Sequence, residues 1–381
     1  MKLGVDAGRA YVKVAEVTAD GPALITRLAT GERYMGACSH VVLAAAKGLD
    51  VVERARRAGF RDVITISPPR AVLLHLAAER QIRPGRRVLL CDAGAASIDL
   101  YLCQLGASVI YVLDSEHGAC LDLAAEMDGL RGAGVFDRRL DHRDDDAEER
   151  LRSLLAWVVR DSQWGDTPAF RDLCVTTAQV HELVQRVAEL AARSAARMRD
   201  RRPDFGSRSG DLLVPLGGAN VFALVRDAVR DALGLSEGAV LPLAHDESLN
   251  AAAYGAARVA AGQPAYDHYP FLLSVAAHRH EGIGSHGEWL ELAAPDQVRL
   301  GGGTYYAQDR MESVLVEAGH RLLVAVGDPA TGRHLECALD VPPGRYHLGV
   351  RVGQSGHGDL VLTPAGGGAV ESSVPLGTLP I

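Results

Sequence analysis

Residues 88–102 read VLLCDAGAASIDLYL, and this stretch decides how the rest of the chain is interpreted. An apolar run ends in an acid, Asp92, then small residues follow, and a second run alternates apolar and polar positions. The pattern predicts a β-hairpin whose turn presents backbone N–H groups to an anion. An acid at the mouth of such a turn is suited to hold a hydrated metal ion.

The same arrangement occurs near the N-terminus, where residues 3–17 read LGVDAGRAYVKVAEV. Either copy alone is typical of a plain hairpin. Because the strand, the Asp-Ala-Gly turn and the second strand occur twice, we expect two halves of the protein to face one phosphate chain.

The composition is that of a globular protein with a substantial core. The chain has 381 residues, of which 48% are hydrophobic and 23% charged, and its formal net charge is −8. That charge argues against a nucleic-acid partner, which usually requires a basic face. The patterns predict no leader and no membrane span, so we expect a cytoplasmic protein. No pair of cysteines has C-x-x-C spacing, so neither a zinc site nor a redox motif is expected. Cys91 and Cys103 fall within predicted strands and are expected to be buried thiols in a reducing compartment.

Further along the chain, predicted strands alternate with predicted helices. Residues 114–118 are expected to form a loop before a helix that begins at Leu121. Residues 211–220 read DLLVPLGGAN, a strand that ends in Gly217 and Gly218 before a helix. A Gly-Gly pair at such a joint lets a flat ligand approach the backbone, and the helix N-terminus favours an anion. A simple helix cap is the alternative interpretation.

The composition changes after Pro264. Short strand-like runs, separated by turns rich in Gly and Pro, predict a small all-β unit over residues 265–381. His278, His280 and His286 fall between two of these runs. We expect them in an exposed loop rather than at a metal, because no acid or cysteine has supporting spacing.

The order of the motifs resembles that of the actin-like ATPase superfamily, specifically the nucleotide-binding domain of DnaK-type heat-shock chaperones. The first and second phosphate loops, the adenosine motif and the terminal Ala-Tyr-Gly-Ala-Ala helix correspond to residues 6–8, 92–97, 216–220 and 253–257. The resemblance implies an α/β, two-lobed actin-like ATPase fold over residues 1–264, with ATP or ADP and Mg²⁺ in a cleft. Residues 265–381 stand where that family has its β-sandwich, which implies a protein or peptide partner there.

Individual residues follow from the resemblance. It implies that Asp6 and Asp92 hold Mg²⁺ through water and are the candidate catalytic acids. Arg9 or Lys13 would replace a missing cation. The nucleotide-binding candidates are Gly8, Arg9, Lys13, Gly94, Ala95, Ala96, Ser97, Gly118, Gly217, Gly218 and Asn220.

Several residues of that family are missing here. Arg9 and Ala10 stand in place of two threonines, and Pro68 stands in place of the catalytic Glu. Only residues 30–39 stand where a subdomain with the catalytic Lys is expected, and Val221 replaces an Arg that packs on adenine. Removing one positioned base or charge costs a factor of about 100 to 10,000 in rate. The resemblance therefore implies hydrolysis that is slow or lost.

Three functions are compatible with these residues. The first is a chaperone-type ATP-binding protein with weak or lost hydrolysis that binds a protein or peptide. The second is a nucleotide-free pseudo-ATPase scaffold, or a protomer of a dimer or filament. The third is a small-molecule kinase, which needs a carboxylate base such as Asp99 or Asp114.

Overall fold

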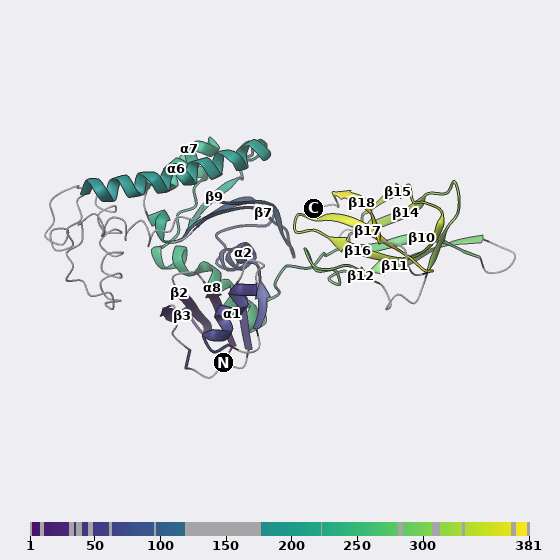
Figure 1. The fold of residues 1–381 in the computed structure, drawn as a ribbon, viewed down its shortest axis with the longest axis horizontal. Coiled ribbons are helices and arrows are strands. Elements are labelled where there is room, and N and C mark those ends of the chain that lie inside the picture. Colours follow the sequence, from purple (N-terminus) through teal and green to yellow (C-terminus); the bar gives the residue numbers. More distant parts are fainter. Residues whose placement is uncertain are drawn as a thin grey trace. The chain divides into compact units, whose positions relative to one another are not determined.

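The computed structural model describes most of the chain and divides it into two compact units (Figure 1). The first unit is drawn from Met1–Gln104 and Asp114–Pro264, and the second from Leu105–Leu113 and Ala265–Ile381. The second unit therefore includes the last residue of one strand, the turn after it, and the first four residues, 110–113, of the next strand. The described residues are 2–7, 11–29, 34–35, 40–44, 49–60, 63–94, 97–118, 177–221, 223–280, 285–306, 313–329, 332–366 and 371–378.

The first unit contains two sheets. One has the order β3-β2-β1-β4-β5 and the other β8-β7-β6-β9. In each sheet the strand that carries a predicted site acid, β1 or β6, pairs antiparallel with the next strand and parallel with a later one. The strands are β1 (Lys2–Ala7), β2 (Tyr11–Thr18), β3 (Gly21–Ala29), β4 (His40–Ala44), β5 (Val63–Ile66), β6 (Arg87–Ala93), β7 (Ile98–Leu105), β8 (Ile110–His117) and β9 (Leu212–Leu216).

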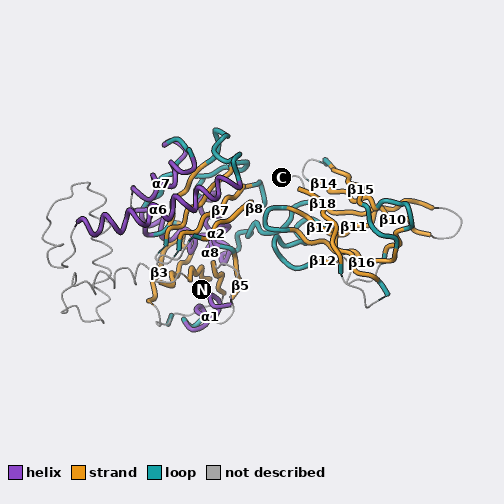
Figure 2. The backbone as a smooth tube through the Cα atoms, turned by 45° about the horizontal axis from the view of Figure 1, so that its top comes forward, coloured by secondary structure: helices purple, strands orange, loops and turns teal. Residues whose placement is uncertain are grey.

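Five α-helices are described, all in the first unit. In Figures 1 and 2, α2 and α8 lie between the two sheets, and α6 and α7 lie side by side. The helices are α1 (Leu49–Arg57), α2 (Pro68–Ala78), α6 (Thr177–Arg201), α7 (Ala223–Leu233) and α8 (His245–Ala261), and the short 3-10 turns are η2 (Gly218–Val221) and η3 (Glu237–Ala239).

Helix α8 packs unusually close to β1 and α2 because a glycine lies at each contact. Gly4 belongs to β1, and Gly255 belongs to α8 itself. A Cβ atom at Gly4 of β1 would collide with the backbone of Ala253 and Ala257. A Cβ atom at Gly255 of α8 would collide with the carbonyl group of Ala71 in α2. Since side chains alternate along a strand, Gly4 and Asp6 share the face of β1 that α8 covers.

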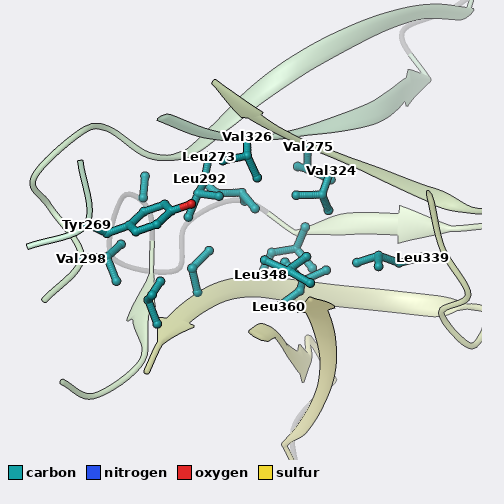
Figure 3. Close-up of a cluster of buried hydrophobic side chains, with 14 of the residues drawn as sticks. Tyr269, Leu273, Val275, Leu292, Val298, Val324, Val326, Leu339, Leu348 and Leu360 are labelled. Carbon is teal, nitrogen blue, oxygen red and sulfur yellow. The ribbon is translucent and has the colours of Figure 1, made fainter. Parts of the chain in front are cut away.

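The second unit contains two antiparallel sheets that share one apolar core (Figure 3). Leu273, Val275 and Val324 come from the sheet β11-β10-β14-β15, and Leu348 and Leu360 from the sheet built around β16 and β17. The strands are β10 (Leu272–His280), β11 (Ser285–Ala293), β12 (Tyr305–Tyr306), β13 (Val314–Val316), β14 (Leu322–Gly327), β15 (His334–Leu339), β16 (Gly344–Val352), β17 (His357–Pro364) and β18 (Ser372–Thr378).

The predicted fold class, an α/β, two-lobed actin-like ATPase fold followed by a β-sandwich, is wrong. Strands hold 42% of the described residues and helices only 26%, and the strands form four small sheets with five α-helices among them (Figure 2). The described residues do not form helix-rich lobes. The physical reason is that short turn motifs constrain a few backbone groups each, whereas helix and strand content depends on the long segments between them.

Two local predictions are also wrong. Residues 114–117, expected in a loop, continue strand β8. His278, His280 and His286, also expected in a loop, belong to β10 and β11, where Arg279 is opposite His286. The helix expected from Leu121 lies outside the described residues. In both cases polar side chains suggested a loop, but alternating polar positions are equally compatible with a strand that has one exposed face.

Cys91 and Cys103 are buried free thiols, as predicted, and burial raises the pKa of each to about 12. Within the described ranges, none of the helices has both the length and the apolar character needed to cross a membrane.

The close approach of α8 and α2 predicts the effect of a minimal substitution. Gly255→Ala would ordinarily favour the helix by about 1 kcal/mol. Here the added methyl group would meet the Ala71 carbonyl, so we expect a net loss of about 2 kcal/mol or more in the free energy of unfolding. Urea denaturation measures this loss. Gly238→Ala, whose Cβ would meet nothing within 4 Å, is the control. Equal effects of the two substitutions would contradict the packing.

Candidate functional site

The first half of the candidate site is a row of charged residues across three strands. Asp6 of β1 lies opposite Lys13 of β2, which lies opposite Arg27 of β3. The Lys13 Nζ atom is 2.9 Å from Asp6 Oδ2 and donates a second hydrogen bond, 2.6 Å long, to the carbonyl oxygen of Leu249 in α8. The side chains of Lys13 and Asp6 are only 20% and 19% exposed, so their charges interact with little screening by water.

The second half is Asp92, near the end of β6. It lies opposite Asp99 of β7 and Leu216 of β9. Burial raises the pKa of Asp92 to about 6; Lys13 lowers it, while Asp6 and Asp99 raise it further. The two acid-bearing strands come together at the start of α8, where Leu249 accepts a hydrogen bond from Lys13 and Ser248 accepts one from Gly217, which lies beside Asp92. We call this place the Asp6–Asp92 site.

Lys13 is the fixed positive charge at the centre of this site. Burial by itself would lower the pKa of its ammonium group, but Asp6 and, to a smaller extent, Asp92 outweigh that effect, and the pKa is raised overall. Lys13 therefore stays protonated at neutral pH. With Asp6 and Asp92 both ionised, these three groups together carry one negative charge.

The Gly-Gly corner after β9 borders Asp92. Gly217 has φ +80°, and a Cβ atom there would lie 2.5 Å from Asp92 Oδ1. The Gly217 N–H group donates to the carbonyl oxygen of Ser248, 3.1 Å away. Ser248 and Leu249 are consecutive, so the start of α8 accepts one hydrogen bond from each half of the site. Gly218 begins η2 and is exposed.

Asn220 is buried behind this corner. Its Nδ2 group donates to the carbonyl oxygen of Cys91, 2.8 Å away, and to that of Leu216. Its Oδ1 atom is buried and has no hydrogen-bond partner in the part of the chain that the structure describes. An acceptor left in this condition costs stability unless a donor reaches it.

The turn after β6 is closed by its own hydrogen bonds. The Gly94 N–H group donates to the Ser97 carbonyl oxygen, 2.9 Å away, and the Ser97 hydroxyl donates to Asp99 Oδ2, 2.8 Å away. Asp99 Oδ1 is 2.9 Å from Nδ1 of His117. The Gly118 N–H group donates to the carbonyl oxygen of Ile98. The N–H groups of Gly94, Gly118 and Gly217 are therefore engaged within the protein and are not the donors that an anion would meet.

Three residues of the site were not predicted from the sequence: Arg27, His117 and Leu249. Arg27 and His117 could have been found by counting back across the predicted hairpins, since paired strands bring fixed positions opposite one another. No local signal points to the carbonyl group of Leu249, which is 236 residues from Lys13. Gly8, Arg9, Ala95 and Ala96 lie outside the described residues.

The residues of the site do not fit a resident Mg²⁺ ion. No group of three or more His, Cys, Asp or Glu side chains suited to a metal occurs among the described residues. Asp6 already binds the ammonium group of Lys13, and that group also acts on Asp92. An Mg²⁺ ion held by these carboxylates would have to lie beside a fixed positive charge.

The two acids considered for kinase chemistry are both engaged. Asp114 Oδ2 is 3.1 Å from Nε of Arg201, and Asp99 binds Ser97 and His117. A general base needs a free oxygen within reach of a substrate hydroxyl. No observation favours the kinase function.

No family model matches the sequence, and no curated protein matches it either. The function is therefore inferred from the geometry of the site.

The pKa of Asp92 makes stability depend on pH in a defined direction. The pKa of Asp92 is about 6 in the folded state, above the ordinary value of 3.8, so the folded state holds the Asp92 proton more tightly than the unfolded state does. Relative to neutral pH, Asp92 therefore stabilises the fold below about pH 4, and this contribution is lost as pH rises through 6. We expect Asp92→Asn to be more stable than the wild type at pH 7.5 by about 1–2 kcal/mol, and by much less at pH 4.5.

Urea denaturation of both proteins at each pH measures this difference. Comparing the two proteins cancels the opposite contribution of His75, whose pKa is lowered to about 4 by burial and by Arg258. Asp20→Asn, in the exposed turn between β2 and β3, is the control. A difference that stays constant from pH 4.5 to pH 7.5 would contradict the raised pKa.

Proposed function

We propose that the Asp6–Asp92 site binds the phosphate groups of a nucleotide, ATP or ADP, and that the protein uses this binding to regulate its hold on a protein or peptide partner. The observation that carries the proposal is Lys13, a buried ammonium group where two acid-bearing hairpins meet. A positioned ammonium group is a common ligand of phosphate oxygens. Arg27, in the same row, supplies a second positive charge.

Two further features support a nucleotide rather than a simple anion. Gly218 carries no side chain, is exposed, and has no atom closer than 4.0 Å to where a Cβ would lie, so a flat group would be able to lie against the backbone there. The buried Oδ1 atom of Asn220 is an acceptor suited to a hydroxyl or amino group of a nucleoside.

The engagement of the acids supports binding with weak or lost hydrolysis. Asp6 is held by Lys13, and Asp99 is held by Ser97 and His117. Helix α2 begins at Pro68, which has no side chain able to accept a proton. A phosphate chain bound beside Lys13 would therefore meet a cation but no free general base among these residues.

The partner-binding role belongs to the second unit in this proposal. Trp289 of β11, Ala276 of β10, Leu323 of β14 and Ala338 of β15 are paired in one row across a sheet. Trp289 is 45% exposed and Leu323 38%, and exposed apolar rows of this kind are frequent at protein-binding surfaces. The buried free thiols Cys91 and Cys103 favour a reducing compartment, and we place the protein in the cytoplasm.

One observation favours a second candidate function, a nucleotide-free scaffold. Lys13 already has two oxygen partners, Asp6 and the carbonyl group of Leu249, and needs no ligand to satisfy its charge. In that case the ion pair would serve only to hold α8 against the first sheet.

Nucleotide titration separates the two candidates. We expect isothermal titration calorimetry to detect ADP and ATP binding to the wild type. Lys13→Ala should weaken it at least about tenfold, which is about 1.4 kcal/mol, because one charge-assisted hydrogen bond is lost. Lys2→Ala, at the exposed start of β1, is the matched control and should bind as the wild type does. Absence of binding to the wild type would favour the scaffold.

A further inference from the structure

We infer that the ammonium group of Lys13 takes the place of a divalent cation at the Asp6–Asp92 site, so that nucleotide binds there without Mg²⁺. We also expect that replacing Lys13 by a neutral residue creates a divalent-cation site from Asp6 and Asp92. Its nucleotide part rests on the proposed function, whereas its metal part does not.

The atoms around the Lys13 ammonium group are those that a hard cation would use. Nζ lies 2.9 Å from a carboxylate oxygen of Asp6 and 2.6 Å from the carbonyl oxygen of Leu249. Asp92 is close enough to act on the same ammonium group. Mg²⁺ and Mn²⁺ prefer carboxylate, carbonyl and water oxygens. The ammonium group therefore already occupies an oxygen-lined position between the Asp6 carboxylate and the Leu249 carbonyl group.

Charge explains why the wild type would exclude the metal. A divalent ion bound to Asp6 would lie within a few ångströms of the fixed positive charge of Lys13, in a site where water screens charges poorly. The ammonium group is tethered to β2 and needs no capture from solution. Removing it leaves the Asp6 carboxylate without its paired cation while Asp92 still acts on Asp6 as a like charge, a condition that a divalent ion relieves.

The type of residue supports this role. Lys13 is one of only three lysines in the sequence, which uses arginine for nearly all its other positive charges. An ammonium group is a compact point charge, whereas a guanidinium group is a broad planar fork. A compact point charge resembles a bound metal ion more closely than a planar fork does.

Manganese is a suitable probe because its binding is measured without nucleotide, by calorimetry and by electron paramagnetic resonance. We expect Lys13→Met, which keeps most of the apolar stem, to bind one Mn²⁺ ion that the wild type does not bind. Adding Asp6→Asn to that variant should abolish the site. Lys2→Met, on the same sheet and exposed, is the matched control and should gain no site.

Nucleotide binding provides a second test of the inference. We expect the wild type to bind ADP equally well, within about twofold, in excess EDTA and in Mg²⁺. Lys13→Met should bind ADP at least about tenfold more weakly in EDTA, because the cation paired with Asp6 is gone, and Mg²⁺ should restore part of that loss.

Each outcome decides the inference. Mn²⁺ binding by the wild type that Asp6→Asn removes would overturn it, as would failure of a folded Lys13→Met variant to gain an Mn²⁺ site. Lys13→Gln, which keeps a hydrogen-bond donor for Leu249, takes its place if Lys13→Met does not fold by circular dichroism. If the wild type binds no nucleotide under any condition, the proposed function fails while the Mn²⁺ arm still decides whether Lys13 stands in for a metal.

Discussion

The close contact of α8 with its neighbours is the constraint on which the rest of the first unit depends. Glycines at positions 4 and 255 let the helix backbone come within reach of β1 and α2, and a Cβ atom at either would collide with backbone. Because α8 lies so near, its first turn accepts hydrogen bonds from Lys13 of one sheet and Gly217 of the other. Small residues thus set the distance at which the two halves of the site meet.

Burial then determines what the assembled charges do. Lys13 is held between a carboxylate and a carbonyl group, and Asp92 has a raised pKa because it is buried near two other acids. In water such charges would interact weakly, but in a partly buried site each one changes the protonation of the others. A single lysine therefore governs both the charge of the site and which ions can enter it.

The error in the fold class has a specific origin. The resemblance was carried by short motifs, such as residues 92–97 and the Gly-Gly corner, which set the path of a turn but not the content of the segments around it. Strand β8 shows the same difficulty on a small scale. Its polar residues 114–117 suggest a loop, yet Arg201 of α6 pairs with Asp114 and Glu116 and keeps them in a strand. Such pairing involves residues distant in sequence, which local patterns do not reveal.

The sequence by itself determined the two acid-tipped hairpins and the glycine corner, because strand alternation and turn chemistry act between near neighbours. That Asp6 lies opposite Lys13 was not predicted from the sequence and is known from the register of β1 and β2. Only the tertiary structure decided that Asp92 acts on Lys13 and that the Leu249 carbonyl group completes the site. Those contacts join residues far apart in the chain, and they depend on how closely a helix packs rather than on any local pattern.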